Sequence, residues 1–260
     1  MQVSSFTTHL CDLLLLSSFT EAVIAGQQAG LLAPRFIVSV QRSGLLGDSH
    51  VCAGAIIAPR KVLTTASCGN GLNPSAAKIR HGSKSITSGG ALILVEKILN
   101  HPEFNANTQI VDICILTVVS SFNLLIGPST TALLPAAKVS ITKIVPVQVA
   151  GWGVTRPSAT SLATSLQITQ MQDVSREKCA KKWTDQRPIT SGMICTVPTI
   201  AGNQSTSICA GDQGDPLVDS TGITVLGLAS FFDDSCSAFP KPNVFANVLE
   251  HAIFNRANMV

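Results

Sequence analysis

The sequence predicts an all-β protein built from many short strands. Segments rich in Val, Ile and Thr recur along its 260 residues and alternate with turn-forming residues, which include 19 glycines. Hydrophobic residues make up 45% of the chain and charged residues 13%, a balance typical of a well-buried core rather than of disorder. With a formal net charge of +3 and no long apolar run, the sequence gives no indication of a nucleic-acid or membrane partner.

Residues 1–22 have features of a signal peptide. The run from Leu13 to Leu16 supplies a short apolar segment, and Ala22 is a small residue that signal peptidase accepts. Asp12 adjoins the apolar segment and no Lys or Arg precedes it, so a disordered N-terminus is the alternative. The eight cysteines favour an oxidising compartment. We therefore expect a secreted, extracellular protein whose mature domain spans residues 23–260.

Hydrophobic patterns place the strands and two helices in order along the chain. Residues 36–41 alternate between apolar and polar, as in a strand with one buried face. Ser175 fits the N-cap of a short helix. The spacing of apolar residues from Val248 to Ile253 predicts a C-terminal helix over 248–258. The further expected strands are 51–57, 78–81, 91–99, 112–118, 145–149, 224–230 and 243–247.

Three motifs carry a resemblance to one family. The segment from Cys209 to Pro216 reads Cys-Ala-Gly-Asp-Gln-Gly-Asp-Pro and resembles the nucleophile loop, Gly-Asp-Ser-Gly-Gly-Pro, of chymotrypsin/trypsin-like serine proteases. Residues 61–68 resemble that family's Trp-Val-Leu-Thr-Ala-Ala-His-Cys, and residues 150–153 match a family turn. The resemblance covers residues 23–258. It implies two six-stranded antiparallel β-barrels, at 23–135 and 136–247, followed by the C-terminal helix.

The resemblance also implies a disulfide pairing, which the residues alone leave open. Cys114 is then left over in an apolar run, where a buried structural thiol is expected. Each bridge would contribute about 2–4 kcal/mol to stability. The implied bridges join Cys52 to Cys68, Cys179 to Cys195 and Cys209 to Cys236.

The catalytic positions implied by the resemblance are Ser67, Asp112 and Gln213, and only the carboxylate is kept. A carboxamide has no hydroxyl to form an acyl-enzyme, and a serine hydroxyl cannot act as a general base near neutral pH. None of the five histidines is expected to take over that role, and each, His50 included, is expected to be a solvated or capping residue. Gly211 keeps the backbone donor of an oxyanion hole, which without nucleophile and base supports only weak catalysis. We therefore expect a catalytically inactive homologue.

The substrate cleft is expected to be obstructed as well. The position that sets primary specificity in the family is Ser207, which gives no ion pair with a Lys or Arg substrate side chain. Phe232 and Asn243 replace glycines that line the family's cleft, and glycine permits close approach of a ligand. The alternative is that loops reorganise and keep the cleft open. With the cleft closed, Phe231 and Phe232 would form an exposed aromatic rim.

Other positions add further expectations. Signal cleavage after Ala22 would free the ammonium of Val23, which could pair with Asp212 without a tryptic activation step. Asn203 begins a glycosylation acceptor. Basic residues between Arg176 and Arg187 form a patch that is either a docking surface or an ordinary solvated helix face. No pattern for a metal or another cofactor occurs in the sequence.

The chain lacks catalytic residues of the family but keeps the residues that determine its fold. In this respect it resembles inactive arthropod homologues of the family. Residues 79–84 and 174–179 read like trypsin-like mite allergens, and scabies mite inactivated protease paralogues share such degraded triads. The resemblance implies a secreted, monomeric pseudoprotease that binds host or self proteins of a protease cascade such as complement. The alternatives are a weakly active serine-type hydrolase, and a secreted protein or allergen without a dedicated partner.

Overall fold

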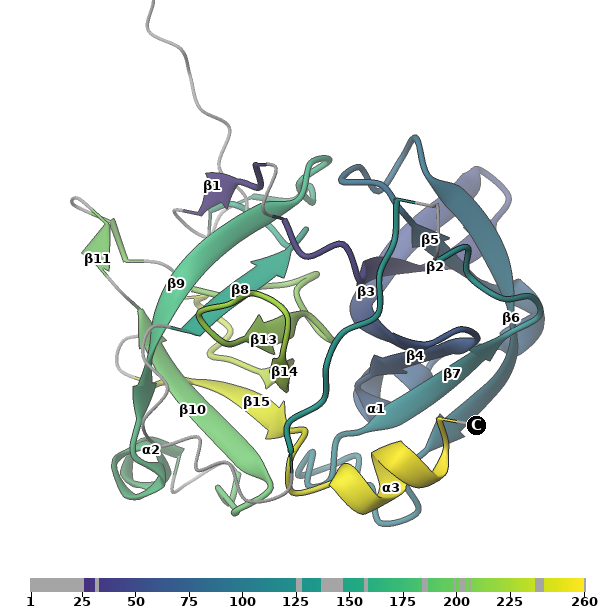
Figure 1. Cartoon of the computed structure of the whole chain (residues 1–260). Helices are drawn as coiled ribbons and strands as arrows, with labels where there is room; N and C mark the ends of the chain where they lie inside the picture. Colours follow the sequence, from purple (N-terminus) through teal and green to yellow (C-terminus); the bar gives the residue numbers. More distant parts are fainter. Residues whose placement is uncertain are drawn as a thin grey trace, which may run out of the picture.

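The computed structural model describes residues 26–30, 33–124, 128–136, 147–156, 159–183, 187–198, 200–201, 204–205, 207–236 and 241–259. These residues form two β-barrels that lie side by side, the earlier one mainly blue and the later one mainly green in Figure 1. Each barrel is closed by six antiparallel strands, which confirms the predicted fold class.

The first barrel runs in the strand order β2-β3-β4-β7-β6-β5. Val40 and Ile79 face each other across β2 and β5 and are fully buried, because alternate residues of a strand point into the barrel. The short helix α1 (Ala66–Gly69) and the 3-10 turn η1 (Pro74–Ala76) follow β4. The strands are β2 (Ile37–Gly44), β3 (Gly47–Ala58), β4 (Lys61–Thr64), β5 (Ala77–His81), β6 (Ala91–Asn100) and β7 (Cys114–Val118).

The second barrel is closed by pairing of β8 with both β9 and β13, and β1 (Gln27–Gln28) adds to the outer edge of β9. Met171 and Phe245 are fully buried in its core. Helix α2 (Arg176–Trp183) follows β9, and the small hairpin β11 (Ile200–Ala201) and β12 (Gln204–Ser205) follows β10. The barrel strands are β8 (Val147–Gly151), β9 (Gln167–Val174), β10 (Met193–Pro198), β13 (Pro216–Val218), β14 (Val225–Phe231) and β15 (Asn243–Asn247).

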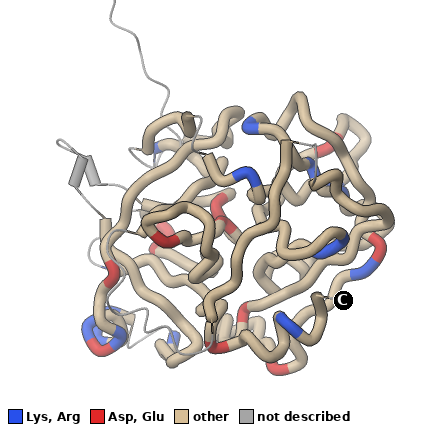
Figure 2. Tube along the Cα trace, in the orientation of Figure 1, with Lys and Arg blue, Asp and Glu red and all other residues tan. Residues whose placement is uncertain are grey.

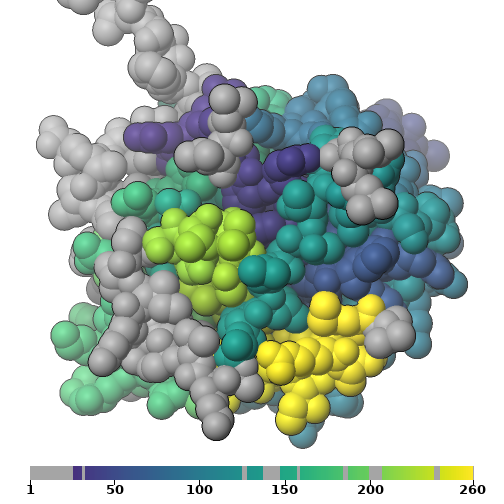
Figure 3. All heavy atoms as spheres, in the orientation of Figure 1, coloured from purple at the N-terminus to yellow at the C-terminus, as the bar shows by residue number. Residues whose placement is uncertain are grey.

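The C-terminal helix α3 (Ala252–Ala257) is shorter than the predicted 248–258. The backbone N–H of Val248 donates to Leu226 O, and that of Leu249 donates to the Asn247 side chain. These bonds hold the first predicted turn against the second barrel, so the helix begins only at Ala252. The space-filling view shows this C-terminal segment, in yellow, lying against the blue and teal surface of the first barrel (Figure 3).

All three implied disulfides are present. The bridges are Cys52–Cys68, Cys179–Cys195 and Cys209–Cys236. Cys114 is buried and unpaired, and burial raises the pKa of its thiol to about 12, so it packs as an apolar side chain. None of the helices in the described part of the chain has the length and apolarity needed to cross a bilayer.

The apolar core of the first barrel extends into the second barrel, which also has a separate core cluster around Met171 and Phe245. Val218, Val225 and Leu228 of the second barrel pack in the same cluster as the first-barrel residues around Val40. Between the barrels runs the loop from Cys209 to Pro216, here called the central loop. The backbone N–H of Ala53 on β3 donates to Gln213 O at 2.8 Å, so this loop is fixed to the first barrel while its ends belong to the second.

Candidate functional site

Two glycines give the central loop its path. Gly211 has φ +93° and Gly214 has φ +81°, both in the left-handed region that side chains rarely adopt. A Cβ on Gly214 would stand 2.1 Å from Ala53 O, so the loop passes the first barrel at a point where only glycine fits. The glycines of the family pattern therefore keep their structural purpose although the serine between them has become Gln213.

Asp112 lies in a small network of serine hydroxyls. Ser67 donates from its backbone N–H to Asp112 Oδ1 at 2.6 Å and from its hydroxyl to Oδ2 at 2.9 Å. The hydroxyl of Ser230 on β14 also donates to Oδ2, at 2.5 Å. Burial raises the pKa of Asp112, and the hydrogen bonds from Ser230 and Ser67 oppose that rise. The structure thus brings Ser67 and Asp112 together, with the Ser67 proton directed at the carboxylate, and the pair lacks the imidazole that is the general base in the family.

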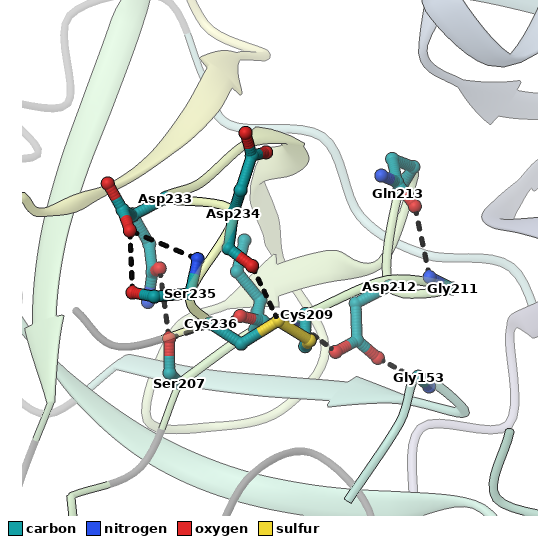
Figure 4. Close-up of a disulfide and its surroundings, with 12 residues drawn as sticks. Gly153, Ser207, Cys209, Gly211, Asp212, Gln213, Asp233, Asp234, Ser235 and Cys236 are labelled. Carbon is teal, nitrogen blue, oxygen red and sulfur yellow. Dashed lines mark hydrogen bonds between the residues drawn. A yellow bond between two sulfur atoms is a disulfide. The ribbon is translucent and has the colours of Figure 1, made fainter. Parts of the chain in front are cut away.

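Gln213 occupies the remnant of the oxyanion hole. Its carboxamide oxygen Oε1 accepts a hydrogen bond from the backbone N–H of Gly211 at 3.2 Å (Figure 4). The Gly211 N–H is the donor that the sequence identified as retained. Because this donor already has a partner within the same loop, a substrate carbonyl would have to displace the Gln213 side chain to reach it.

Two side chains contact each other at the position of the family's primary specificity pocket. Ser207 and Asn243 are both buried, and the Ser207 hydroxyl donates to Asn243 Oδ1 at 3.2 Å. The amide of Asn243 in turn reaches the sulfur of Met171 at 3.9 Å. The Asn243 side chain, at a position where the family has glycine, is therefore buried and hydrogen-bonded inside the protein.

A second obstruction was not foreseen from the sequence. Gln109 donates from Nε2 to the backbone carbonyl of Ser230 at 3.4 Å, next to the segment whose main chain holds the substrate strand in the family. The guanidinium of Arg187 donates to Gln109 Oε1 and lies 4.7 Å from the centroid of the Phe231 ring. Gln109 and Arg187 are thus linked to the backbone of Ser230, where the resemblance places the substrate strand. Gln109 has φ 54° and Val111 has φ 56°, conformations that no sequence pattern here indicates.

The expected exposed aromatic rim is wrong. Phe231 is only 4% exposed, because it packs edge-on against Trp183, with ring centroids 5.1 Å apart, and lies under Arg187. Phe232 is half-buried and packs beside the Cys209–Cys236 disulfide. Both rings thus gain burial inside the molecule rather than a place on its surface.

His50 was expected to be solvated or a capping residue, and this expectation is wrong. Its Nδ1 lies 2.8 Å from Ser39 Oγ, and its Nε2 lies 3.0 Å from the carbonyl oxygen of Gly211. Burial lowers the pKa of His50 to about 4, so the ring is neutral at physiological pH. His50 is a positioning residue that fixes the central loop from β3, and only the fold brings it there.

Two further predicted features lie outside the described residues: the ammonium of Val23 and the glycosylation candidate Asn203. Asp212, the expected partner of Val23, accepts hydrogen bonds from the backbone N–H groups of Cys209 at 2.8 Å and Gly153 at 2.7 Å (Figure 4). The carboxyl of Asp212 is therefore already hydrogen-bonded to backbone N–H groups of the described residues.

The basic patch lies on α2. Figure 2 shows its blue positions gathered at one end of the molecule with red beside them. Lys181 pairs with Glu177 at 3.0 Å, and both side chains are more than 70% exposed, which fits a solvated helix face. The described part of the chain holds no group of three His, Cys, Asp or Glu side chains that could bind a metal ion.

This double barrel, with a loop of nucleophile type and a buried aspartate between the halves, defines a serine-endopeptidase domain. Residues 23–253 match the family described as trypsin, so the chain belongs to the trypsin family. Trypsin beta of Drosophila erecta is 30% identical over 91% of this chain and 88% of its own length. Trypsin alpha-4 of Lucilia cuprina is 32% identical over 81% of this chain and 77% of its own length.

Among solved structures, the fold resembles that of scabies mite inactivated protease paralogue S-D1. The TM-score is 0.76 with 23% identity, and the match covers 92% of this chain and 99% of the other. At this level of identity the likeness shows a common fold.

Restoring the triad should restore reactivity toward small molecules only. We predict that Ser67→His with Gln213→Ser raises the rate of labelling by a fluorophosphonate at least roughly 10³-fold over the native chain. Peptide cleavage should stay undetectable until Gln109→Ala and Asn243→Gly are added, because those side chains occupy the groove and the pocket. Ser67→His with Gln213→Ala is the control that lacks a nucleophile. Peptide cleavage by the first double variant would show an open cleft.

His50, whose ring is hydrogen-bonded at both nitrogens, should make the fold sensitive to acid. The folded pKa of about 4 lies below the ordinary value of 6.5, so the stabilising neutral state is fully present above pH 6.5 and is lost as pH falls toward 4. The loss should reach about 3 kcal/mol. We predict that the free energy of unfolding of the native chain exceeds that of His50→Asn by less at acidic pH than at neutral pH, and that the difference changes by this amount. Urea unfolding of both proteins at the two pH values measures it. A constant difference between the two proteins would contradict the prediction.

Proposed function

We propose that this chain is a secreted, proteolytically inactive member of the trypsin family that acts by binding another protein. The observation that carries the proposal is the hydrogen bond between Gln213 Oε1 and the Gly211 N–H. It puts a side chain without nucleophilic character on the donor that would otherwise stabilise a tetrahedral intermediate. Ser67, at the position of the general base, supports the same conclusion because its hydroxyl is committed to Asp112.

Secretion is supported by the disulfides. Three bridges occur in the described structure, and disulfides persist in oxidising compartments such as the extracellular space. The proposed partners are host or self proteins of a defence cascade, with complement as the leading case. Support for a mite-type role comes from the fold shared with the paralogue named as inactivated.

A hairpin tip offers a surface for such binding. Gly44 pairs with Gly47 at the end of β2 and β3, which leaves Leu45 and Leu46 as the turn. Both leucines are fully exposed, at 106% relative accessibility, so they gain no burial in the isolated molecule. Exposed apolar side chains that protrude in this way are typical of protein interaction sites.

Inactivity is tested directly on the secreted protein. We predict no labelling by a fluorophosphonate and no cleavage across a peptide panel, because the chain offers neither nucleophile nor base at the site. An active trypsin measured in parallel gives the detection limit. Labelling that disappears in Gln213→Ala would overturn the proposal in favour of a weakly active hydrolase.

Binding is tested in vertebrate serum with antibody-coated erythrocytes. We predict that the native protein inhibits complement lysis and that Leu45→Asp with Leu46→Asp reduces this inhibition at least about tenfold, the effect of losing roughly 1.4 kcal/mol of binding energy. Ile253→Asp is the matched control, since Ile253 is 89% exposed on α3.

Each outcome decides a different part of the proposal. Equal inhibition by the native protein and the double variant would exclude the hairpin tip. No inhibition by the native protein would exclude complement, and failure to retain any protein from plasma would exclude binding as the function.

A further inference from the structure

A second buried acid lies beside Asp212 in the central loop. Asp215 stands where the family pattern has glycine, and both aspartates have an exposed fraction of 0%. The point where a Cβ on Gly151 would stand is 1.5 Å from Asp215 Oδ2 and 2.6 Å from Asp212 Oδ1. The two carboxyl groups therefore face each other across this glycine.

The two acids differ in their hydrogen bonds. Asp212 accepts from the backbone N–H groups of Cys209 and Gly153, which favours its ionised form. Neither oxygen of Asp215 has a hydrogen-bond partner of that kind anywhere in the described chain. A carboxylate at the Asp215 position would be a buried charge with no donor, which is among the most costly arrangements in a protein.

No described cation compensates these acids. Among the ion pairs of the described residues, none involves Asp212 or Asp215. The turn of Gly151 and Gly153 brings no titratable group to the pair. On the neighbouring β3, Asp48 pairs with Lys78, and the ring of His50 is bonded to Gly211 O and kept neutral by burial.

We propose that Asp215 keeps its proton at neutral pH and donates it to Asp212, so that a carboxyl–carboxylate hydrogen bond stabilises the central loop in place of a cation. One proton satisfies the unpartnered acid and leaves a single negative charge, which the two backbone N–H groups at Asp212 solvate. The central loop would then be ordered whether or not the chain begins at Val23. Order in the loop would be uncoupled from N-terminal processing.

Electrostatics support this protonation pattern. Burial, followed by repulsion from Asp212, raises the pKa of Asp215 well above its ordinary range, while burial raises the pKa of Asp212 to about 6. A raised carboxyl pKa means that the folded chain binds a proton which the unfolded chain releases. Its contribution to stability is therefore complete below the ordinary carboxyl pKa of 3.8 and decreases as pH rises toward the folded pKa.

Infrared spectroscopy and urea unfolding of the full chain test the proposal. At about neutral pH we expect the carbonyl stretching band of a protonated carboxylic acid, present in the native chain and in Asp234→Asn but absent in Asp215→Asn. Asp234 is an exposed aspartate, so Asp234→Asn makes the same chemical change outside the pair. Between roughly pH 5 and pH 8, the unfolding midpoint of the native chain should fall relative to that of Asp215→Asn. Asp215→Gly, the family residue, serves if Asp215→Asn does not fold.

Three outcomes would overturn the proposal. The first is a native spectrum without the band. The second is the same pH dependence in the native chain and in both Asp215 variants. The third is a band that occurs in a chain with residues added before Val23 and disappears in material shown by N-terminal sequencing to begin at Val23. The last result would show that the α-ammonium replaces the proton.

Discussion

The attachment of the central loop to both barrels is the constraint on which the rest of the site depends. Ala53 on β3 donates to Gln213 O, and Gly214 donates to Ala229 O on β14, both at 2.8 Å. His50 adds a contact to the carbonyl of Gly211. These hydrogen bonds to the backbone of the loop do not depend on the side chain at position 213. This explains how the nucleophile could become a carboxamide while the path of the chain kept the form typical of the family.

The proposed inactivity would come from occupied positions as well as from missing catalytic groups. Gln213 uses the retained amide donor, Asn243 binds Ser207 in the pocket, and Gln109 uses the carbonyl of Ser230. Each of these contacts satisfies a polar group that substrate would otherwise satisfy. Buried polar groups without partners are costly, so a protease fold that no longer meets substrate is more stable when its own side chains take these places.

The fold could be predicted because its evidence is local and repeated. Glycines, cysteines and apolar runs occur in the family order. Strand β15 has its predicted limits, and β3 begins four residues before and ends one residue after its predicted limits. β9, β10 and β13 were missed because their segments show no clear alternation in sequence. The start of α3 depended in part on the hydrogen bond from the Val248 N–H to Leu226 O in the second barrel, a tertiary contact that leaves no local signal.

Of the site, only the replaced catalytic and pocket residues could be predicted from the sequence. Ser67, Gln213 and Asn243 could be found by matching motifs, whereas the contacts that replace substrate could not. Gln109 reaches Ser230 from 121 positions away, and His50 reaches Gly211 from 161. The prediction for Phe231 failed because Trp183 and Arg187, which cover its ring, belong to the segment around α2.

The left-handed conformations of Gln109 and Val111 link two parts of the molecule through one short segment. A β-branched residue such as Val111 is held at φ 56° only while its surroundings enforce it. Relaxation of that segment would withdraw Gln109 from the groove and at the same time shift Asp112 away from the serines that solvate it. Groove opening and loss of the aspartate network would then be a single cooperative event, so amide protons on both sides of the cleft should exchange with deuterium at one common rate.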